Sequence, residues 1–194
     1  MHVRWRKKYT TALIGLLVAI IVAVGQNQGW LDSAQKGVVN TQPGLYAIEH
    51  YVDGDTIAVT MNGTSETIRM IGIDTPETHK PNTPVQCYGP AAAAYTQNRI
   101  KAAGGKVRLV SDSLSTNRDR YNRLLRYVYL TDNTNLDQEL VAKGYAFAYT
   151  SFPFTKSADF SAAQASAQTH QLGLWGNCQP YQESNGRWQS NNQS

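Results

Sequence analysis

The dipeptide Asn62-Gly63 joins two strand-like runs, 56–61 and 66–73. Asn-Gly is typical of a two-residue hairpin turn, because both central residues take a positive φ. The runs on either side are strand-like in composition. The pattern therefore predicts a β-hairpin that brings residues just before the first strand close to residues just after the second.

Further runs of this kind extend the predicted sheet. Residues 45–52, 106–111 and 124–130 are strand-like, and residues 145–149 predict another short strand. Short strands that begin as a meander, with helices between them, fit a small barrel of the OB type with helices packed on it. We therefore expect an α+β fold, mainly β, with a five-stranded OB barrel and about three helices.

Helix signals lie between these strands. Pro90 is well placed at the first helical position of a helix over 91–103, and two glycines follow that helix. A second helix is predicted over 135–143. Ser157 is predicted as the N-cap of a third, over 158–172.

The N-terminus has a leader-like pattern. Four basic residues, Arg4, Arg6, Lys7 and Lys8, precede the uncharged run 10–25. The run is shorter than the roughly 20 residues that span a bilayer, which favours a signal peptide over residues 1–25, with an uncleaved membrane anchor as the alternative. Either one predicts an extracellular or cell-surface protein.

The basic balance of the chain comes from this leader. Four of the 18 Lys and Arg residues lie in it and none of the 14 acidic residues do, so the remainder has no net charge. The overall charge is thus no sign that the domain as a whole binds nucleic acid.

The other segments are assigned by composition. Residues 26–44 are polar and aperiodic and predict a linker, and residues 179–194, rich in Gln, Asn and Ser, predict a disordered tail. The folded domain is expected over 45–178. Its two cysteines, Cys87 and Cys178, are expected to form a disulfide, because exported proteins fold under oxidising conditions.

The predicted hairpin gathers acidic residues at one end. It brings Asp55 near Asp74, and two carboxylates with a backbone carbonyl from Thr75 and several waters suit Ca²⁺. The absence of His and Cys from this group argues against zinc or copper. Each residue also has an ordinary interpretation, since Asp-Gly-Asp is a common turn, and only the joint spacing points to a metal site.

Two more residues complete a hydrolytic site. Glu77 follows a proline, which fixes its backbone in a turn from which the side chain can reach over the cation. Arg69 lies on the same predicted strand as Asp74 and offers a rigid fork for phosphate. The group therefore predicts a metal-assisted phosphodiesterase.

Several motifs resemble those of the staphylococcal (micrococcal) nuclease family, also called thermonucleases. The resemblance covers nearly all of residues 45–175. Its motifs are VDGDT (52–56), IRMIGIDTPET (68–78), YGPA (88–91), DRYNR (119–123), LVAKG (140–144) and LGLW (172–175). Asn122 stands where the family often has glycine, although asparagine tolerates a left-handed conformation.

The resemblance implies a Ca²⁺-dependent endonuclease that cleaves DNA and RNA, with single-stranded or denatured substrate favoured, to 3′-phosphate ends. It implies a catalytic base at Glu77, and Arg69 and Arg123 as the residues that stabilise the transition state. By position, the implied metal ligands are Asp55, Asp74 and Thr75, and the implied substrate-binding residues are Arg120, Tyr121 and Tyr149.

Two other functions stay open at this point. One is a non-catalytic nucleic-acid-binding OB module at the cell surface, and the other is a surface domain in which Ca²⁺ only adds stability. We expect a monomer, held at a membrane only if the N-terminal segment is not cleaved.

Overall fold

The structure, a computed structural model, describes residues 41–78 and 84–192. The predicted leader and residues 26–40 of the predicted linker lie outside the described residues. No helix in the described part of the chain is both long and apolar enough to cross a membrane. The folded unit begins at Thr41, with the first residue of strand β1, so it includes the last residues of the predicted linker.

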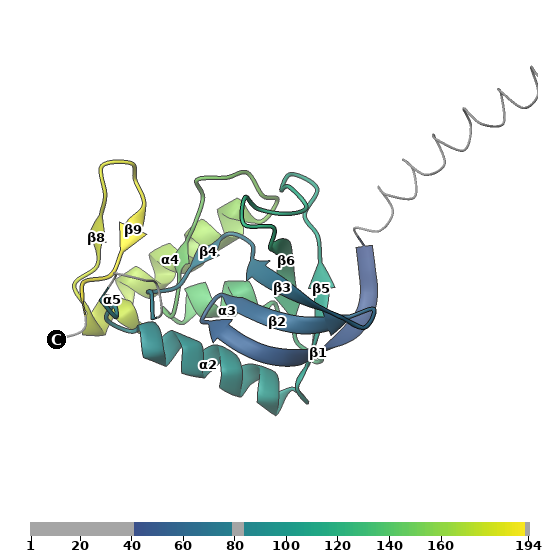
Figure 1. The fold of residues 1–194 in the computed structure, drawn as a ribbon. Helices are drawn as coiled ribbons and strands as arrows, with labels where there is room; N and C mark the ends of the chain where they lie inside the picture. Colours follow the sequence, from purple (N-terminus) through teal and green to yellow (C-terminus); the bar gives the residue numbers. More distant parts are fainter. Residues whose placement is uncertain (1–40, 79–83, 193–194) are drawn as a thin grey trace, which may run out of the picture. The chain divides into compact units, whose positions relative to one another are not determined.

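Five strands close into a barrel in the order β1-β2-β3-β6-β5, and β5 pairs again with β1 (Figure 1). The β3–β6 pairing is parallel and the others are antiparallel. This confirms the predicted fold class, an OB-like barrel with helices. The strands are β1 (Thr41–Asp53), β2 (Thr56–Met61), β3 (Thr64–Met70), β5 (Lys106–Val110) and β6 (Leu124–Tyr129).

The predicted hairpin joins β2 to β3. Asn62 and Gly63 have φ values of 51° and 79°, as a two-residue turn with two left-handed residues requires. The register pairs Met61 with Thr64 at the turn and Thr56 with Arg69 at the other end. That end of the hairpin is where the predicted metal-binding residues begin.

The barrel interior is filled by apolar side chains from alternate strand positions. Those of Ile57, Val59, Ile68 and Met70 on the hairpin are buried, and Val107, Leu109 and Val128 from β5 and β6 close the core. On a pleated strand every second side chain points to the same face, so these residues share the inner face of the barrel.

The described residues include four helices in addition to the barrel: α2 (Gly89–Ala102), α3 (Leu136–Ala142), α4 (Ser157–Thr169) and α5 (Leu174–Asn177). The first three follow the predicted helices, with Pro90 in the first turn of α2. The prediction that Ser157 caps α4 is wrong: Lys156 holds the cap position, with no side-chain cap bond. Ser157 instead donates its backbone N–H to Phe154 O at 3.3 Å, so the preceding turn already satisfies that donor.

Gly72 ends the hairpin strand and redirects the chain. Its φ is +73°, and a Cβ there would lie 2.5 Å from the ring of Phe154, so only glycine fits without a shift. The predicted strand 66–73 is therefore divided. A separate strand, β4 (Ile73–Asp74), pairs with β7 (Phe147–Ala148) and sets the position of Asp74.

The C-terminal segment differs from its prediction. Residues 179–192 are not a disordered tail, because strands β8 (Tyr181–Gln182) and β9 (Trp188–Gln189) pair into a hairpin. The Cys87–Cys178 disulfide, which is present as predicted, joins the start of this segment to the residues just before α2. The C-terminal segment is therefore ordered by the disulfide and by aromatic contacts with distant residues, and not by a local apolar periodicity.

Candidate active site

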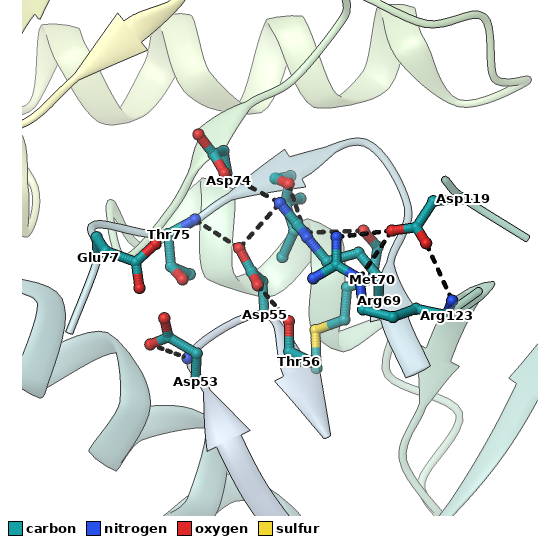
Figure 2. A network of polar contacts seen from close by, with 12 residues as sticks. Asp53, Asp55, Thr56, Arg69, Met70, Asp74, Thr75, Glu77, Asp119 and Arg123 are labelled. Carbon is teal, nitrogen blue, oxygen red and sulfur yellow. Dashed lines mark hydrogen bonds and ion pairs between the residues drawn. The ribbon is translucent and has the colours of Figure 1, made fainter. Parts of the chain in front are cut away.

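Two carboxylates meet at the end of the β2–β3 hairpin. Asp55 is buried just before β2; its Oδ1 accepts Thr56 Oγ1–H at 2.8 Å and its Oδ2 accepts Thr75 N–H at 2.9 Å. Asp74 ends β4. Arg69 Nη2 lies 3.1 Å from Asp55 Oδ2 and 3.0 Å from Asp74 Oδ1, so one guanidinium nitrogen contacts both acids (Figure 2).

Arg69 is held in this position by its second nitrogen. Nη1 donates to the backbone carbonyls of Met70 at 3.1 Å and Ile73 at 2.9 Å, and only 14% of the side chain is exposed. Burial raises the pKa of Asp74, and the attraction of Arg69 only partly opposes that rise. The site thus combines buried negative charge with a fixed cation.

Glu77 lies on the loop that follows Thr75. Its backbone is fixed by Gln86, which accepts Glu77 N–H through Oε1 at 2.7 Å and donates its own N–H to Glu77 O at 2.9 Å. In the view of Figure 2, Glu77 lies beside Thr75, at the opposite end of the group from Arg123. The general base and one of the arginines predicted for the site therefore approach it from different elements.

Asp53 is a third acid at this site. Its Oδ1 accepts Gly54 N–H at 2.8 Å and Thr78 Oγ1–H at 2.9 Å. Burial and the charge of Asp55 raise the pKa of Asp53 to about 6. Its sequence context is an ordinary Asp-Gly-Asp turn. Its place beside the predicted metal ligands could only have been found from the position of Asp55, two residues on.

The loop before β6 carries a second group of charged side chains at the site. Asp119 Oδ2 contacts Arg123 Nε and Nη2, both at 2.7 Å. Asn122 has a φ of 65°, the left-handed conformation expected of an asparagine at a family glycine position. Tyr121 is 65% exposed, and the guanidiniums of Arg120 and Arg123 lie 4.8 and 5.4 Å from its ring centre.

All nine residues predicted as catalytic, metal-binding or substrate-binding line one cavity of about 1050 Å³. They come from the turn before β2, from β3 and β4, from the loop after β4, from the loop before β6 and from the segment after β7. The roles assigned to them stay predictions. The nine are Asp55, Arg69, Asp74, Thr75, Glu77, Arg120, Tyr121, Arg123 and Tyr149.

The donor set fits a hard cation. Asp55 and Asp74 already contact one common nitrogen, and buried Thr75 Oγ1 has no hydrogen-bond partner within the described ranges. Oxygen donors of this kind suit Ca²⁺. Across residues 41–78 and 84–192, no group of three or more His, Cys, Asp or Glu side chains is spaced to hold a metal. The chain thus offers two carboxylates, and backbone carbonyls and water would complete the coordination.

Sequence reasoning also missed a basic residue of the cavity, Arg187. It lies in the segment predicted to be disordered, and its Nη2 is 2.7 Å from Asp74 Oδ2. The signal was present: Asn185-Gly186 is a hairpin-turn pair flanked by Tyr181 and Trp188.

Comparisons with known proteins agree with this site. The sequence model of a family described as "Staphylococcal nuclease homologue" matches residues 67–177. The thermonuclease of Staphylococcus intermedius is 37% identical over 170 residues, which cover 87% of this chain and 98% of that protein. The thermonuclease of Staphylococcus hyicus is 39% identical over 175 residues, or 88% and 99% of the two chains. The SPbeta prophage-derived endonuclease YokF of Bacillus subtilis is 42% identical over 130 residues, which cover 66% of this chain and 43% of that protein.

Proposed function

Since the chain belongs to the staphylococcal nuclease family and is a nuclease, we propose that it uses Ca²⁺ to hydrolyse phosphodiester bonds of DNA and RNA and leaves 3′-phosphate ends. One observation carries the proposal: two carboxylates, a further glutamate and two arginines line a single cavity. That set supplies ligands for a hard cation, a base for water and positive charge for phosphate.

Asp55, Asp74 and the backbone carbonyl of Thr75 would hold the cation. When bound, Ca²⁺ supplies positive charge that polarises the phosphoryl group and favours ionisation of nearby water. Thr75 N–H donates to Asp55 Oδ2 at 2.9 Å, so this contact orients one carboxylate in advance. Pre-oriented ligands lower the reorganisation that binding requires.

The protein groups then share the proton and the charge. The Glu77 carboxylate accepts a proton from the attacking water as the water oxygen bonds to phosphorus. The bond from phosphorus to the 5′-oxygen breaks, and that oxygen takes a proton from solvent water to leave as a 5′-hydroxyl. Arg69 and Arg123 donate to phosphate oxygens, where negative charge grows in the transition state. Both guanidiniums already rest against carboxylates, 3.0 Å from Asp74 and 2.7 Å from Asp119, so their orientation is set before substrate arrives.

Aromatic side chains beside these charges favour unpaired bases as substrate. Tyr121 is largely exposed next to Arg120, and Tyr149 lines the cavity near Asp74. Bases can stack on such rings only when they are not held in a duplex, so single-stranded or denatured nucleic acid is the favoured substrate.

Export and oligomeric state belong to the same proposal. The charge pattern of residues 1–25 supports export through a signal peptide, or through an anchor if it stays uncleaved. A disulfide in a domain this small supports an oxidising compartment. One chain contributes every predicted site residue, which supports a monomer as the active form.

The test is digestion of single-stranded DNA and RNA by the purified full chain with Ca²⁺, before and after excess chelator. We expect cleavage with Ca²⁺ and its loss with the chelator. Product ends identify the bond broken: a 3′-phosphate blocks extension by a polymerase until a phosphatase removes it. Cleavage that persists with chelator, or ends that extend at once, would contradict the proposal.

Matched variants tie the activity to the cavity. Glu77→Gln should lose about 10²-fold or more in rate, because the side chain keeps its size and loses its basicity. Asp159→Asn, an equal change on an exposed face of α4, should cleave like the wild-type chain.

A further inference from the structure

The C-terminal hairpin, residues 179–192, forms part of the cavity wall. It is fixed at several points. Cys87 donates its N–H to Asn191 O at 2.7 Å, and Ser190, only 2% exposed, donates its hydroxyl to Cys87 O at 2.9 Å. The Trp188 ring lies 5.1 Å from that of Trp175. The hairpin is therefore an ordered support for any side chain it presents to the cavity.

Arg187 is the side chain that this support presents. Its Nη2 and Nε lie 2.7 and 3.2 Å from Asp74 Oδ2, and its guanidinium lies 5.5 Å from the ring centre of Tyr149. Asp74 is thus held between two arginines, with Arg69 on Oδ1 and Arg187 on Oδ2. Both oxygens of a predicted metal ligand are neutralised by the chain itself.

The two arginines differ in freedom. Arg69 is 14% exposed and also bonds two backbone carbonyls, whereas Arg187 is 37% exposed. A cation bound at Asp74 would repel both guanidiniums, and Arg187 is the more exposed of the two. Released from Asp74, it would have donors available beside Tyr149, and a planar guanidinium with free donors pairs well with phosphate.

We propose that Arg187 is a further substrate-binding residue, which exchanges Asp74 for a phosphate oxygen of the nucleic acid. The phosphate is one adjacent to that held by Arg69 and Arg123, because Arg187 enters the cavity from a different element. This inference rests on the proposed function. Arg187 places a guanidinium beside Tyr149, in addition to the guanidiniums that lie beside Tyr121.

The test measures how binding depends on salt. A fluorescein-labelled single-stranded octamer with phosphorothioate linkages keeps one charge per linkage and resists hydrolysis. Its anisotropy is followed with the full, oxidised chain in Ca²⁺ at several KCl concentrations. For single strands, each lost phosphate contact reduces the slope of log K against log salt by about 0.7. We expect that reduction for Arg187→Gln, with about tenfold weaker binding at low salt.

Two further variants make the result specific. Arg108→Gln removes the same charge from β5, at a residue outside the cavity lining, and should keep the wild-type slope. Arg187→Lys keeps the charge and should keep most of the slope while binding less tightly, because lysine lacks the fork. Equal slopes for Arg187→Gln and Arg108→Gln overturn the inference. The inference is also overturned if Arg187→Gln and Arg187→Lys both bind more weakly but keep the wild-type salt slope. That result would show that the Arg187–Asp74 ion pair has only a structural role.

Steady-state kinetics provide a second reading. A residue that holds substrate equally in the ground and transition states affects KM, so Arg187→Gln should raise KM about tenfold and leave kcat within about twofold. A fall in kcat with KM unchanged would contradict a substrate-binding role. If the wild-type chain neither binds the octamer nor cleaves DNA, the proposed function fails and this inference with it. If the wild-type chain cleaves DNA and Arg187→Gln binds and cleaves as the wild-type chain does, only the role inferred for Arg187 is wrong, and the proposed function stands.

Discussion

Arg123 Nη2 lies 2.7 Å from Asp119 Oδ2, while Asp119 Oδ1 accepts the backbone N–H of Arg123 at 3.0 Å. One carboxylate thus fixes both the main chain and the side chain of this arginine across the left-handed Asn122. Burial acts to raise the pKa of Asp119, but the hydrogen bonds from Arg123 outweigh it and hold that pKa below its usual value. Asp119 is therefore ionised at neutral pH, and it orients Arg123 before substrate binds.

Replacing Arg123 should remove most of the activity. We expect Arg123→Ala to lower kcat/KM by about 10²-fold to 10³-fold, because a fixed donor to the developing charge is lost. Plasmid digestion measures the loss, and circular dichroism should show an unchanged fold, since the side chain lies in a surface loop. Arg108→Ala is the matched control, and near-normal turnover by Arg123→Ala would end the assignment.

Asp119 should act mainly through Arg123, although its Oδ1 also accepts Tyr121 N–H at 2.9 Å. We expect Asp119→Ala to lower kcat about tenfold, since the arginine stays charged but loses its fixed orientation. The double variant Asp119→Ala/Arg123→Ala should then be no slower than Arg123→Ala, because residues that act as a unit are not additive. A double variant that loses the product of the two single effects would show that Asp119 has a separate role.

Ca²⁺ should stabilise the fold through Asp55 and Asp74. A ligand that binds only the folded state at 100 times its Kd adds about 2.7 kcal/mol to the free energy of unfolding. Thermal unfolding with Ca²⁺ and with chelator should show this as a rise in Tm. Asp55→Asn and Asp74→Asn should abolish the rise, whereas Asp159→Asn should keep it. A full rise in both site variants would place the ion elsewhere.

The parts of the fold that were predictable are those set by neighbouring residues. Asn62-Gly63 favours a turn with two left-handed residues, and strand-like runs flank it, so the hairpin and its open end could be placed from sequence. Pro90 likewise marked the first turn of α2. Because the predicted metal ligands lie at the open end of that hairpin, most of the site could be placed with it.

The parts that were missed depend on contacts between distant residues. A strand over 145–149 was predicted, but its pairing as β7 with β4 was not, because that pairing needs Gly72 to turn the chain toward a partner more than seventy positions later. The C-terminal hairpin has little local apolar pattern, and it is ordered by the disulfide and by Trp188 against Trp175. Arg187 was missed for that reason, since its place in the site follows from the hairpin.

Asp137 makes stability depend on pH. Its side chain is fully buried in the first turn of α3; Oδ2 accepts Val128 N–H at 2.7 Å, and Oδ1 has no hydrogen-bond partner in the described part of the chain. Burial raises the pKa of Asp137 to about 8, against about 3.9 in an unfolded chain. Between these values the folded state keeps a proton that the unfolded chain has released. The free energy of unfolding should therefore fall as the pH rises from about 4 to about 8.

Asp137→Asn should remove this part of the pH dependence, because the amide does not titrate. We expect urea unfolding of the wild-type chain to lose about 1 kcal/mol per pH unit more than the variant does between pH 5 and pH 8. Asp159→Asn, on the exposed face of α4, should follow the wild-type curve. Parallel curves for wild type and Asp137→Asn would show that Asp137 is ionised in the folded state.

The disulfide should matter for stability and, through Arg187, for substrate binding. Cys87 and Cys178 are 91 residues apart, and a crosslink over so long a loop contributes about 4 kcal/mol in the chain-entropy model. Cys87→Ala/Cys178→Ala should lower the free energy of unfolding by about that amount. Below its Tm the variant should also have a raised KM with kcat little changed, because loosening the hairpin loosens Arg187. Adding Arg187→Gln to the cysteine double variant tests this link. If the disulfide positions Arg187, the triple variant should have the same KM as the cysteine double variant. A further rise in KM, equal to the rise that Arg187→Gln causes alone, would show that the disulfide does not position Arg187.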